Sequence, residues 1–191
     1  MTTVAIVYHS GYGHTKRQAE AVKEGAASVE GVRVTFLTAQ EAEENIESLN
    51  EVDAIIFGAP TYMGSASGPM KSFMDATSKP WFQSKWKDKI AGGFTNSGSA
   101  SGDKLSTLTQ FAVLAAQHGM IWVSLGENNQ AVDPGYNGAA EDAINRLGGY
   151  LGAMAQSENA PAEEGNPPKG DIDTAFGYGA RVAKAAQRWN A

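Results

Sequence analysis

Short runs of apolar residues alternate with helical patterns along this chain of 191 residues, and this alternation restricts the folds that it can adopt. Val4–Tyr8 and Ala54–Phe57 are apolar at nearly every position, which is typical of strands buried on both faces of a parallel sheet. Such strands require helices on both faces of the sheet. The pattern therefore predicts an α/β fold. The predicted strands are Val4–Tyr8, Val32–Leu37, Ala54–Phe57, Ile90–Phe94 and Met120–Val123.

Apolar residues recur every three or four positions between most of these strands, which is typical of amphipathic helices. The predicted helices are Thr15–Val29, a short one beginning near Pro69, Asp103–His118, and a final one with the stripe Ala175, Tyr178, Val182, Ala185 and Trp189. Strands and helices in this order are compatible with a flavodoxin-like, doubly wound, five-stranded parallel sheet of strand order 2-1-3-4-5. Ligands of such a sheet bind beside the carboxyl ends of its strands.

The whole length, residues 1–191, fits one domain, because domains typically contain roughly 100 to 200 residues. The region at about residues 126–170 departs from the regular alternation. Within it, Ala139–Leu147 is a candidate helix, and a Gly-rich run and several prolines follow. We therefore expect a single domain with an irregular excursion at about 126–170.

The chain contains no cysteine, which excludes disulfides, thiol catalysis, iron–sulfur clusters and thiolate zinc sites, and no metal site is expected. Redox chemistry would therefore require a bound cofactor. The net charge is -6 and no basic run is long enough to neutralise a nucleic-acid backbone, so we expect no nucleic-acid partner. No apolar stretch is long enough to cross a membrane and the N-terminus shows no export pattern, which predicts a cytoplasmic protein.

Glycines and hydroxyl residues fill the loop Ser10–Thr15, which joins the first strand to the first helix. Free N–H groups and the positive dipole at a helix N-terminus favour an anion, and hydroxyl groups add donors. A Walker A loop requires Gly-Lys followed by Ser or Thr, whereas Gly13 is followed by His14 here. The dinucleotide fingerprint also fails, because Lys16 stands where its third glycine is due. The loop therefore predicts a site for the phosphate of a mononucleotide.

Two further loops follow the third and fourth strands and would reach the same edge of the sheet. Gly58–Ser65 contains an aromatic residue, a thioether and small hydroxyl residues, which suit a flat ring. Thr95–Gly102 is rich in backbone and hydroxyl donors, which suit a ring edge with several carbonyl groups. Together with the first loop, they predict a mononucleotide that carries a planar ring.

Three segments resemble the flavodoxin-like FMN proteins, and within them the WrbA-type NAD(P)H:quinone oxidoreductases. These segments are Ser10–Thr15, Asp53–Thr61 and His118–Met120, and the resemblance extends over most of the chain. It implies FMN as the cofactor and NADH or NADPH as the electron donor. In these relatives the first loop binds the FMN phosphate, the second holds the isoalloxazine ring, and the third surrounds its pyrimidine side. The matching residues are Ser10, Tyr12, Gly13, His14 and Thr15; Pro60, Thr61, Tyr62, Met63, Gly64 and Ser65; and Asn96, Ser97, Gly98, Ser99 and Ala100.

The resemblance also implies a site for the substrates on the open face of the flavin. The histidine before Gly-Met approaches the flavin in these relatives, often from a neighbouring subunit, and His118 matches it. At a helix end, such a histidine can equally be stabilised by the helix dipole alone. Trp81 matches an aromatic residue on the substrate side, with Trp86 as the alternative counterpart. Tyr12 either touches the nicotinamide ring or covers the phosphate.

The implied function is an FMN-dependent oxidoreductase that transfers two electrons from NAD(P)H to a quinone by ping-pong chemistry, as a homodimer or homotetramer. No side chain need be an obligate acid or base, because the cofactor carries the chemistry. Two alternatives are a flavodoxin-type electron carrier and a flavin-sensing interaction protein. The second loop lacks the Pro-Thr-Arg-Phe-Gly-Asn sequence common in the family, so that a cation near the ring is missing.

Overall fold

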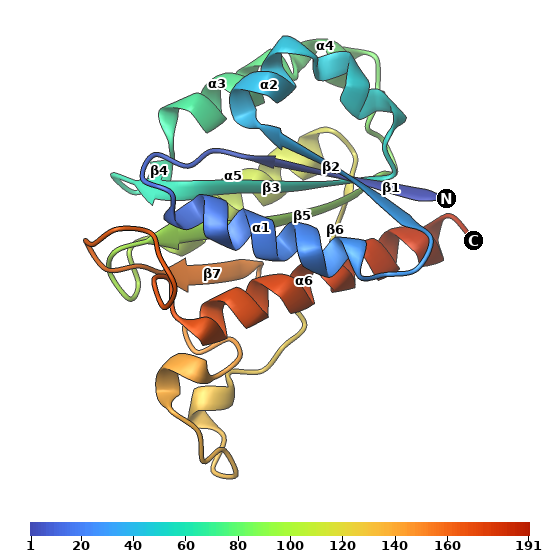
Figure 1. Ribbon diagram of the computed structural model, residues 1–191. Helices are drawn as coiled ribbons and strands as arrows, with labels where there is room; N and C mark the ends of the chain where they lie inside the picture. The colour runs from blue at the N-terminus through green and yellow to red at the C-terminus, as the bar shows by residue number, and fades with distance from the viewer.

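A parallel sheet forms the middle layer of the structure, a computed structural model that describes residues 1–191 (Figure 1). Its strands lie in the order β2-β1-β3-β5-β6. Because β4 is a short strand outside this path, the order is the predicted flavodoxin-like one, and the prediction is confirmed. The strands of the path are β1 (Thr2–Tyr8), β2 (Val32–Thr38), β3 (Ala54–Tyr62), β5 (Ile90–Ser97) and β6 (Ile121–Trp122).

Helices cover both faces of the sheet, as predicted. Side chains alternate between the faces along each strand, so Val4 and Ile6 enter one core cluster and Ala5 and Val7 enter the other. The first cluster lies under α1 (His14–Ala27) and α6 (Lys169–Trp189), which run side by side in Figure 1. The second lies under α3 (Gly68–Ala76) and α5 (Lys104–Gln117). Burial on both faces explains the continuous apolarity of the central strands.

Short elements complete the second layer. Helix α2 (Ala39–Glu44) begins with a capping box, in which Thr38 and Glu41 each accept a hydrogen bond from the other's backbone N–H. It is followed by η1 (Ile46–Glu51), while α4 (Ser78–Phe82) follows α3. The two-residue strand β4 (Ser65–Ala66) pairs antiparallel with the end of β3. No helix has the length and apolarity that crossing a membrane requires.

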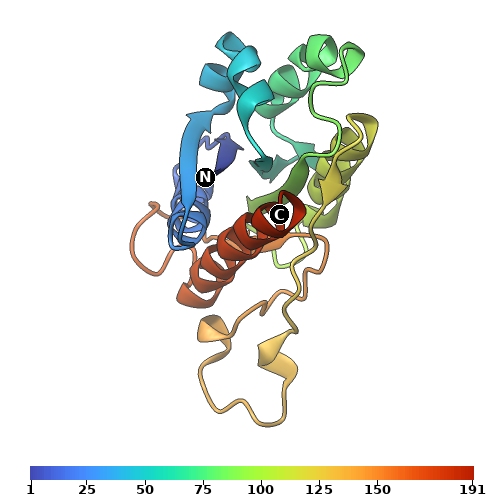
Figure 2. The same cartoon turned by 90° about the vertical axis from the view of Figure 1, so that its right-hand side faces the viewer.

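The fifth strand of the sheet is divided in two by an insertion. The first half, β6, pairs with the start of β5, and the second half, β7 (Ala153–Gln156), pairs with the end of β5. The middle of the intervening segment, with η2 (Gln130–Val132) and η3 (Ala140–Asp142), projects from the body of the molecule, in yellow and orange in Figure 2. The segment contains no other helix or strand.

Two predictions for this region are therefore wrong. Ala139–Leu147 forms no helix beyond η3, and the excursion does not continue to residue 170, because β7 and the start of α6 lie within that range. Strand β7 pairs with a distant segment, and a Cβ on Gly152 would lie 2.1 Å from the carbonyl oxygen of Gly93. Only a glycine permits this close approach. The Gly-rich run therefore leads directly into strand β7, which packs closely against β5.

The predicted apolar stripe of the final helix needs correction at its end. Ala175, Tyr178 and Val182 are buried, whereas Trp189 is exposed. Trp189 is the last residue of α6.

Candidate functional site

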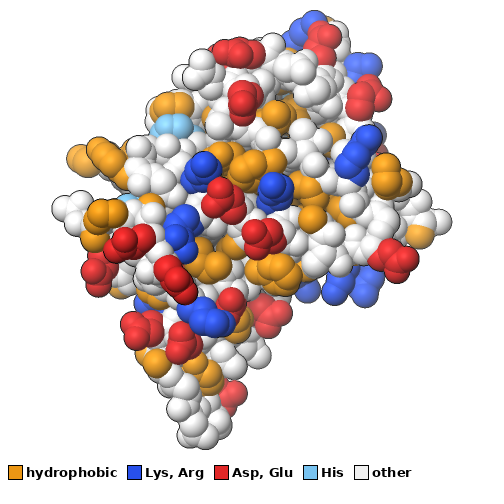
Figure 3. Space-filling view, in the orientation of Figure 1, with side chains coloured by type: hydrophobic (Ala, Val, Ile, Leu, Met, Phe, Trp, Pro, Cys, Tyr) orange, Lys and Arg blue, Asp and Glu red, His pale blue; other side chains and the backbone are white.

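The carboxyl ends of β1, β3, β5 and β7 meet at one edge of the sheet and surround a cavity of about 620 Å³. This volume lies within the roughly 300 to 1,000 Å³ of small-molecule sites. Apolar side chains project at this end of the molecule, on the left of Figure 3. The lining residues are Ser10, Tyr12, His14, Thr15, Pro60, Tyr62, Asn96, Gly98, Ser157, Glu158, Asn159, Ala160 and Pro161.

The first loop is folded around the hydroxyl of Ser10. Its Oγ accepts hydrogen bonds from the N–H groups of Gly13 and Lys16, both at 3.1 Å. Gly13 has φ 94°, a conformation that favours glycine, and directly precedes α1. The N–H groups of Tyr12, His14 and Thr15 donate to no group of the chain. The loop thus presents free donors at the N-terminus of a 14-residue helix, which is the environment that a phosphate requires.

The end of β3 supplies Pro60 and Tyr62 to the cavity, but not Thr61. The Thr61 hydroxyl bonds the hydroxyls of Thr95 and Thr107 in the interior, both at 2.8 Å. The strand continues to Tyr62, so alternate residues turn away from the cavity, whereas the sequence predicted a loop from Gly58.

Met63, Gly64 and Ser65 also fall outside the cavity lining. Met63 and Gly64 form the two-residue turn between β3 and β4, with φ of 49° and 79°, and Met63 is fully exposed. The Ser65 hydroxyl donates to the Gln110 carboxamide at 3.3 Å.

Two tyrosines stand over the first loop. The rings of Tyr12 and Tyr62 meet edge to face at 6.3 Å. A Cβ on Gly11 would lie 2.5 Å from the Tyr62 hydroxyl, so a larger residue at this position would displace the Tyr62 ring. Burial, followed by the charge of Tyr12, raises the pKa of Tyr62, which stays protonated at neutral pH.

The third loop offers unpaired donors and one unpaired acceptor. The side chain of Asn96 donates to the Ser157 hydroxyl at 2.9 Å, while its Oδ1 is buried without a partner. None of the N–H groups from Gly98 to Asp103 donates to a group of the chain. An N–H group of a ring could satisfy Asn96, and ring carbonyl oxygens could accept from the loop. The donor set therefore fits a flavin.

Only part of the predicted third loop lines the cavity. Asn96 and Ser97 belong to β5, which is longer than predicted. Ser97 and Ser99 turn toward the buried side chain of Lys104, and Ala100 lines a separate hollow. Gly98 is thus the main contact of this segment beyond the strand.

The residues Ser157–Pro161 form a wall of the cavity that the sequence did not predict. His14 Nε2 lies 2.8 Å from the carbonyl oxygen of Ala160, which joins this wall to the first loop. Asn166 supports the wall from behind, because its side chain accepts from the Glu158 N–H at 2.9 Å and donates to the Pro161 carbonyl at 3.0 Å. The wall follows β7, so the only signal for it was a strand too short to recognise from its sequence.

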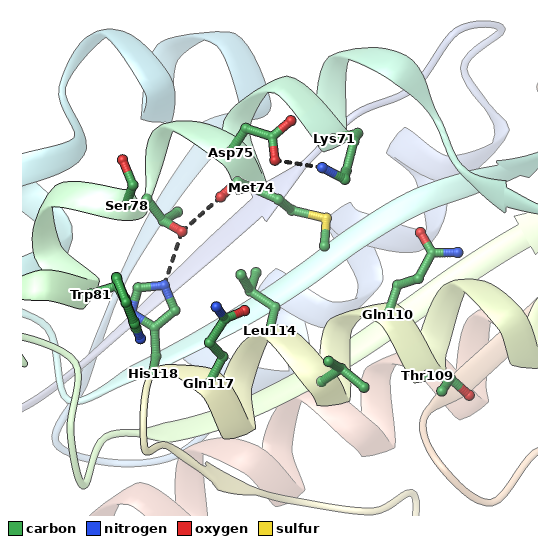
Figure 4. Close-up of a pocket in the computed structure, with 12 residues that line it drawn as sticks. Lys71, Met74, Asp75, Ser78, Trp81, Thr109, Gln110, Leu114, Gln117 and His118 are labelled. Carbon is green, nitrogen blue, oxygen red and sulfur yellow. Dashed lines mark hydrogen bonds and ion pairs between the residues drawn. The ribbon is translucent and has the colours of Figure 1, made fainter.

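His118 and Trp81 lie apart from this cavity, in a groove of about 470 Å³ between α3, α4 and α5 (Figure 4). Within one chain neither residue lies beside Tyr12, because α5 carries His118 at its far end, away from the carboxyl edge of the sheet. The approach of these residues to a flavin, which the family resemblance places at a neighbouring subunit for His118, stays a prediction. Trp81 is 45% exposed, whereas Trp86 is fully buried and its indole donates to Asn50 at 3.0 Å. Of the two tryptophans, only Trp81 presents its ring to a ligand.

The surroundings of His118 keep its imidazole neutral. Its Nε2 lies 2.9 Å from the Thr77 hydroxyl, which itself donates to the Met74 carbonyl, so Nε2 donates to Thr77. Nδ1 is then an acceptor, buried without a partner, and the ring stacks on Trp86 at 4.4 Å. Burial lowers the pKa of His118 to about 4.

Comparisons with known proteins agree with this fold and cavity. A family model described as NADPH-dependent FMN reductase matches residues 9–130. The chain is 44% identical to a flavodoxin, FldP, of Pseudomonas aeruginosa (strain UCBPP-PA14), over 100% of both chains. It is 31% identical to an NAD(P)H dehydrogenase (quinone) of Syntrophobacter fumaroxidans (strain DSM 10017 / MPOB), over 82% of this chain and 88% of the other. The crystal structure of a flavodoxin, WrbA-like protein from Agrobacterium tumefaciens matches with a TM-score of 0.75 and 44% identity, over 98% and 99% of the two chains.

Proposed function

Because this chain belongs to the flavodoxin-like FMN proteins of the WrbA type, in the NADPH-dependent FMN reductase family, we propose that it binds FMN in the cavity at the carboxyl edge of its sheet. The free N–H groups of the first loop carry this proposal, since they stand at the N-terminus of α1. They and the Thr15 side chain would hold the phosphate, while Ser10 keeps the loop in shape. Pro60, Tyr62, Asn96 and Gly98 would hold the ring.

We infer that the protein oxidises NADH or NADPH and reduces a quinone. Bound FMN would supply this chemistry by accepting a hydride and passing on two electrons. The chain's own groups bind and orient the ring and leave one face open to each substrate in turn, which is consistent with ping-pong kinetics. A cytoplasmic location, where NADH and NADPH are available, fits this activity.

A second copy of the chain would complete the substrate site. Trp81 and His118 share a groove on one chain that is separate from its own cofactor cavity. A homodimer or homotetramer can bring the groove of one subunit to the cavity of another. The apolar ring of Trp81 and the neutral imidazole of His118 suit contact with a flat, uncharged quinone.

Titration of the protein with FMN and with FAD, followed by absorbance and calorimetry, tests the cofactor. We expect FMN to bind and FAD to bind poorly, because the first loop is built around a terminal phosphate. Ser10→Ala with Thr15→Ala should weaken FMN binding by roughly tenfold or more per lost charge-assisted hydrogen bond. Ser72→Ala, an exposed change on α3, is the control. Equal affinity for FMN and FAD, or unchanged FMN affinity of the double variant, would overturn the proposal.

A flavodoxin-type electron carrier is the second candidate, because the relative from Pseudomonas aeruginosa is named a flavodoxin. Acidic and basic side chains are mixed over the face shown in Figure 3, rather than gathered into an acidic docking surface. Turnover distinguishes the two functions. The FMN-loaded protein should reduce benzoquinone with NADPH over many cycles, whereas a carrier would show no steady-state turnover.

A further inference from the structure

Lys104, the first residue of α5, is a fully buried cation below the third loop. Its ammonium donates to the Ser97 hydroxyl at 2.6 Å and to the Ser99 carbonyl at 2.7 Å. Lysine is almost never fully buried without compensating partners, because desolvating a charge is costly. The proposed function so far gives this cation no role.

The loop is shaped around Lys104. Gly102 and Asp103 both have φ of 53°, a left-handed conformation that turns the chain inward before α5. A Cβ on Gly102 would lie 1.9 Å from the Ser97 Oγ, so only glycine permits the contact between Ser97 and Lys104. Because the carbonyl and N–H of a trans peptide point in opposite directions, the inward carbonyl of Ser99 leaves the N–H of Ala100 pointing outward. Lys104 therefore fixes the backbone on both sides of Gly98, the residue of this loop that lines the cavity.

The other charges that face Lys104 do not neutralise it. Asp171 is the anion that acts on the charge of Lys104, but it already pairs with Arg146 through two hydrogen bonds, at 2.8 and 2.9 Å. Asp171 also accepts from the Gln156 N–H at 2.8 Å. Two cations, Lys104 and Arg146, thus face one anion, and one net positive charge lies under the loop.

We propose that Lys104 is a positioning residue that holds the third loop for the flavin ring and supplies a fixed positive charge near it. The inference rests on the proposed function, in which this loop surrounds the pyrimidine side of FMN. When two electrons and one proton enter the oxidised ring, one negative charge remains on it. A nearby cation stabilises this charged form more than the oxidised form, so that it raises the reduction potential of bound FMN.

Lys104 carries its charge at neutral pH. Burial lowers the pKa of its ammonium to about 8, which is still above pH 7. A negative charge on a neighbouring ring would raise the pKa again and keep the ammonium protonated throughout reduction.

The test is the FMN reduction potential of Lys104→Gln, measured at pH 7 by dithionite titration with a reference dye. Glutamine keeps an N–H donor on a side chain one bond shorter but has no charge, and FMN affinity of the oxidised form reports any change in loop shape separately from the potential. We expect reduced FMN to lose about tenfold more affinity than oxidised FMN, which corresponds to a potential about 30 mV lower. Lys104→Arg, which keeps the charge, should restore most of the difference. If Lys104→Gln loses its folded circular dichroism spectrum, Lys104→Met replaces it; this variant removes the charge and the hydrogen bonds together, and it should also lower the potential.

Lys89 provides a matched control. Its ammonium also donates to two backbone carbonyls, those of Asn50 at 2.9 Å and Val52 at 2.5 Å, but it precedes β5 and lies at the opposite edge of the sheet. Lys89→Gln should leave the potential unchanged. A folded Lys104→Gln protein that binds FMN at the parent potential would overturn the inference and leave the proposed function intact. A parent protein that binds no FMN would overturn both.

Discussion

At the scale of single residues, His118 shows what a buried polar group costs. The imidazole stacks on Trp86, donates to Thr77, and leaves Nδ1 buried without a partner. Protonation would place a charge in this apolar setting, which is why burial lowers the pKa of His118 to about 4. The unfolded chain binds this proton near the ordinary pKa of about 6.5. Stability is therefore coupled to pH at this residue.

We predict that the protein loses stability in acid through His118. The contribution of His118 is fully present above about pH 6.5 and is lost as pH falls through about 4. The loss in unfolding free energy should be on the order of 2 to 3 kcal/mol. Urea denaturation at pH 7, 6, 5 and 4 measures it. His118→Gln should flatten this part of the profile, and His14→Gln should not. An unchanged profile in His118→Gln would exclude His118 as the source.

At the scale of elements, two glycines allow α1 and α6 to pack with their backbones in contact. A Cβ on Gly25 of α1 would lie 1.8 Å from the carbonyl oxygen of Phe176, and one on Gly179 of α6 would lie 2.0 Å from that of Val22. Glycine lowers the helix propensity of both positions by about 1 kcal/mol relative to alanine. The close approach of the helices offsets this cost.

We therefore predict that Gly25→Ala and Gly179→Ala each destabilise the protein by about 1 to 3 kcal/mol, because the helices must separate. Gly177→Ala is the control, since nothing lies within 4 Å of its Cβ position in the same helix. That change should stabilise the protein by about 0.4 to 1 kcal/mol. Thermal and urea unfolding of the three variants give the comparison. Stabilisation by all three would mean that the helices adjust without strain.

At the scale of the whole molecule, the separation of the cofactor cavity from the groove of Trp81 and His118 makes a prediction about assembly. We expect a homo-oligomer at micromolar concentration. A subunit with Ser10→Ala and Thr15→Ala and a subunit with Trp81→Ala and His118→Ala should each be poorly active alone. Mixed and allowed to exchange subunits, they should recover about a quarter of parental quinone reduction, because one site of each hybrid dimer is intact.

Light scattering and steady-state kinetics on the mixture check this prediction. Each variant must first show a folded circular dichroism spectrum, and the tryptophan and histidine variant must retain FMN. A monomeric mass with full activity would contradict the shared site. So would a mixture that is no more active than its components.

Local patterns predicted the layers of the fold and the first loop. Val4–Tyr8 is apolar because both of its faces are buried. Burial on both faces requires apolar side chains at consecutive positions, so a short segment of sequence is enough to recognise it. Ser10–Thr15 likewise acts through neighbours in sequence, because Ser10 bonds the N–H groups of Gly13 and Lys16. Glycine geometry and strand burial are short-range properties, so the sequence by itself determined the central strands, their two-sided burial and the position of the first loop.

Tertiary structure decided which distant segments share a site. Four-residue β7 exists because it pairs with β5, and only that pairing brings Ser157–Pro161 to the cavity. Lys104 follows the predicted third loop directly, yet its burial depends on residues from β5 and on the charges of Asp171 and Arg146. His118 and Trp81 match residues near the flavin in the related family, but within one chain they lie in a groove separate from the cofactor cavity. The reason is that α5 runs away from the carboxyl edge of the sheet. These arrangements come from contacts between residues far apart in sequence, whose energies no short window of residues contains.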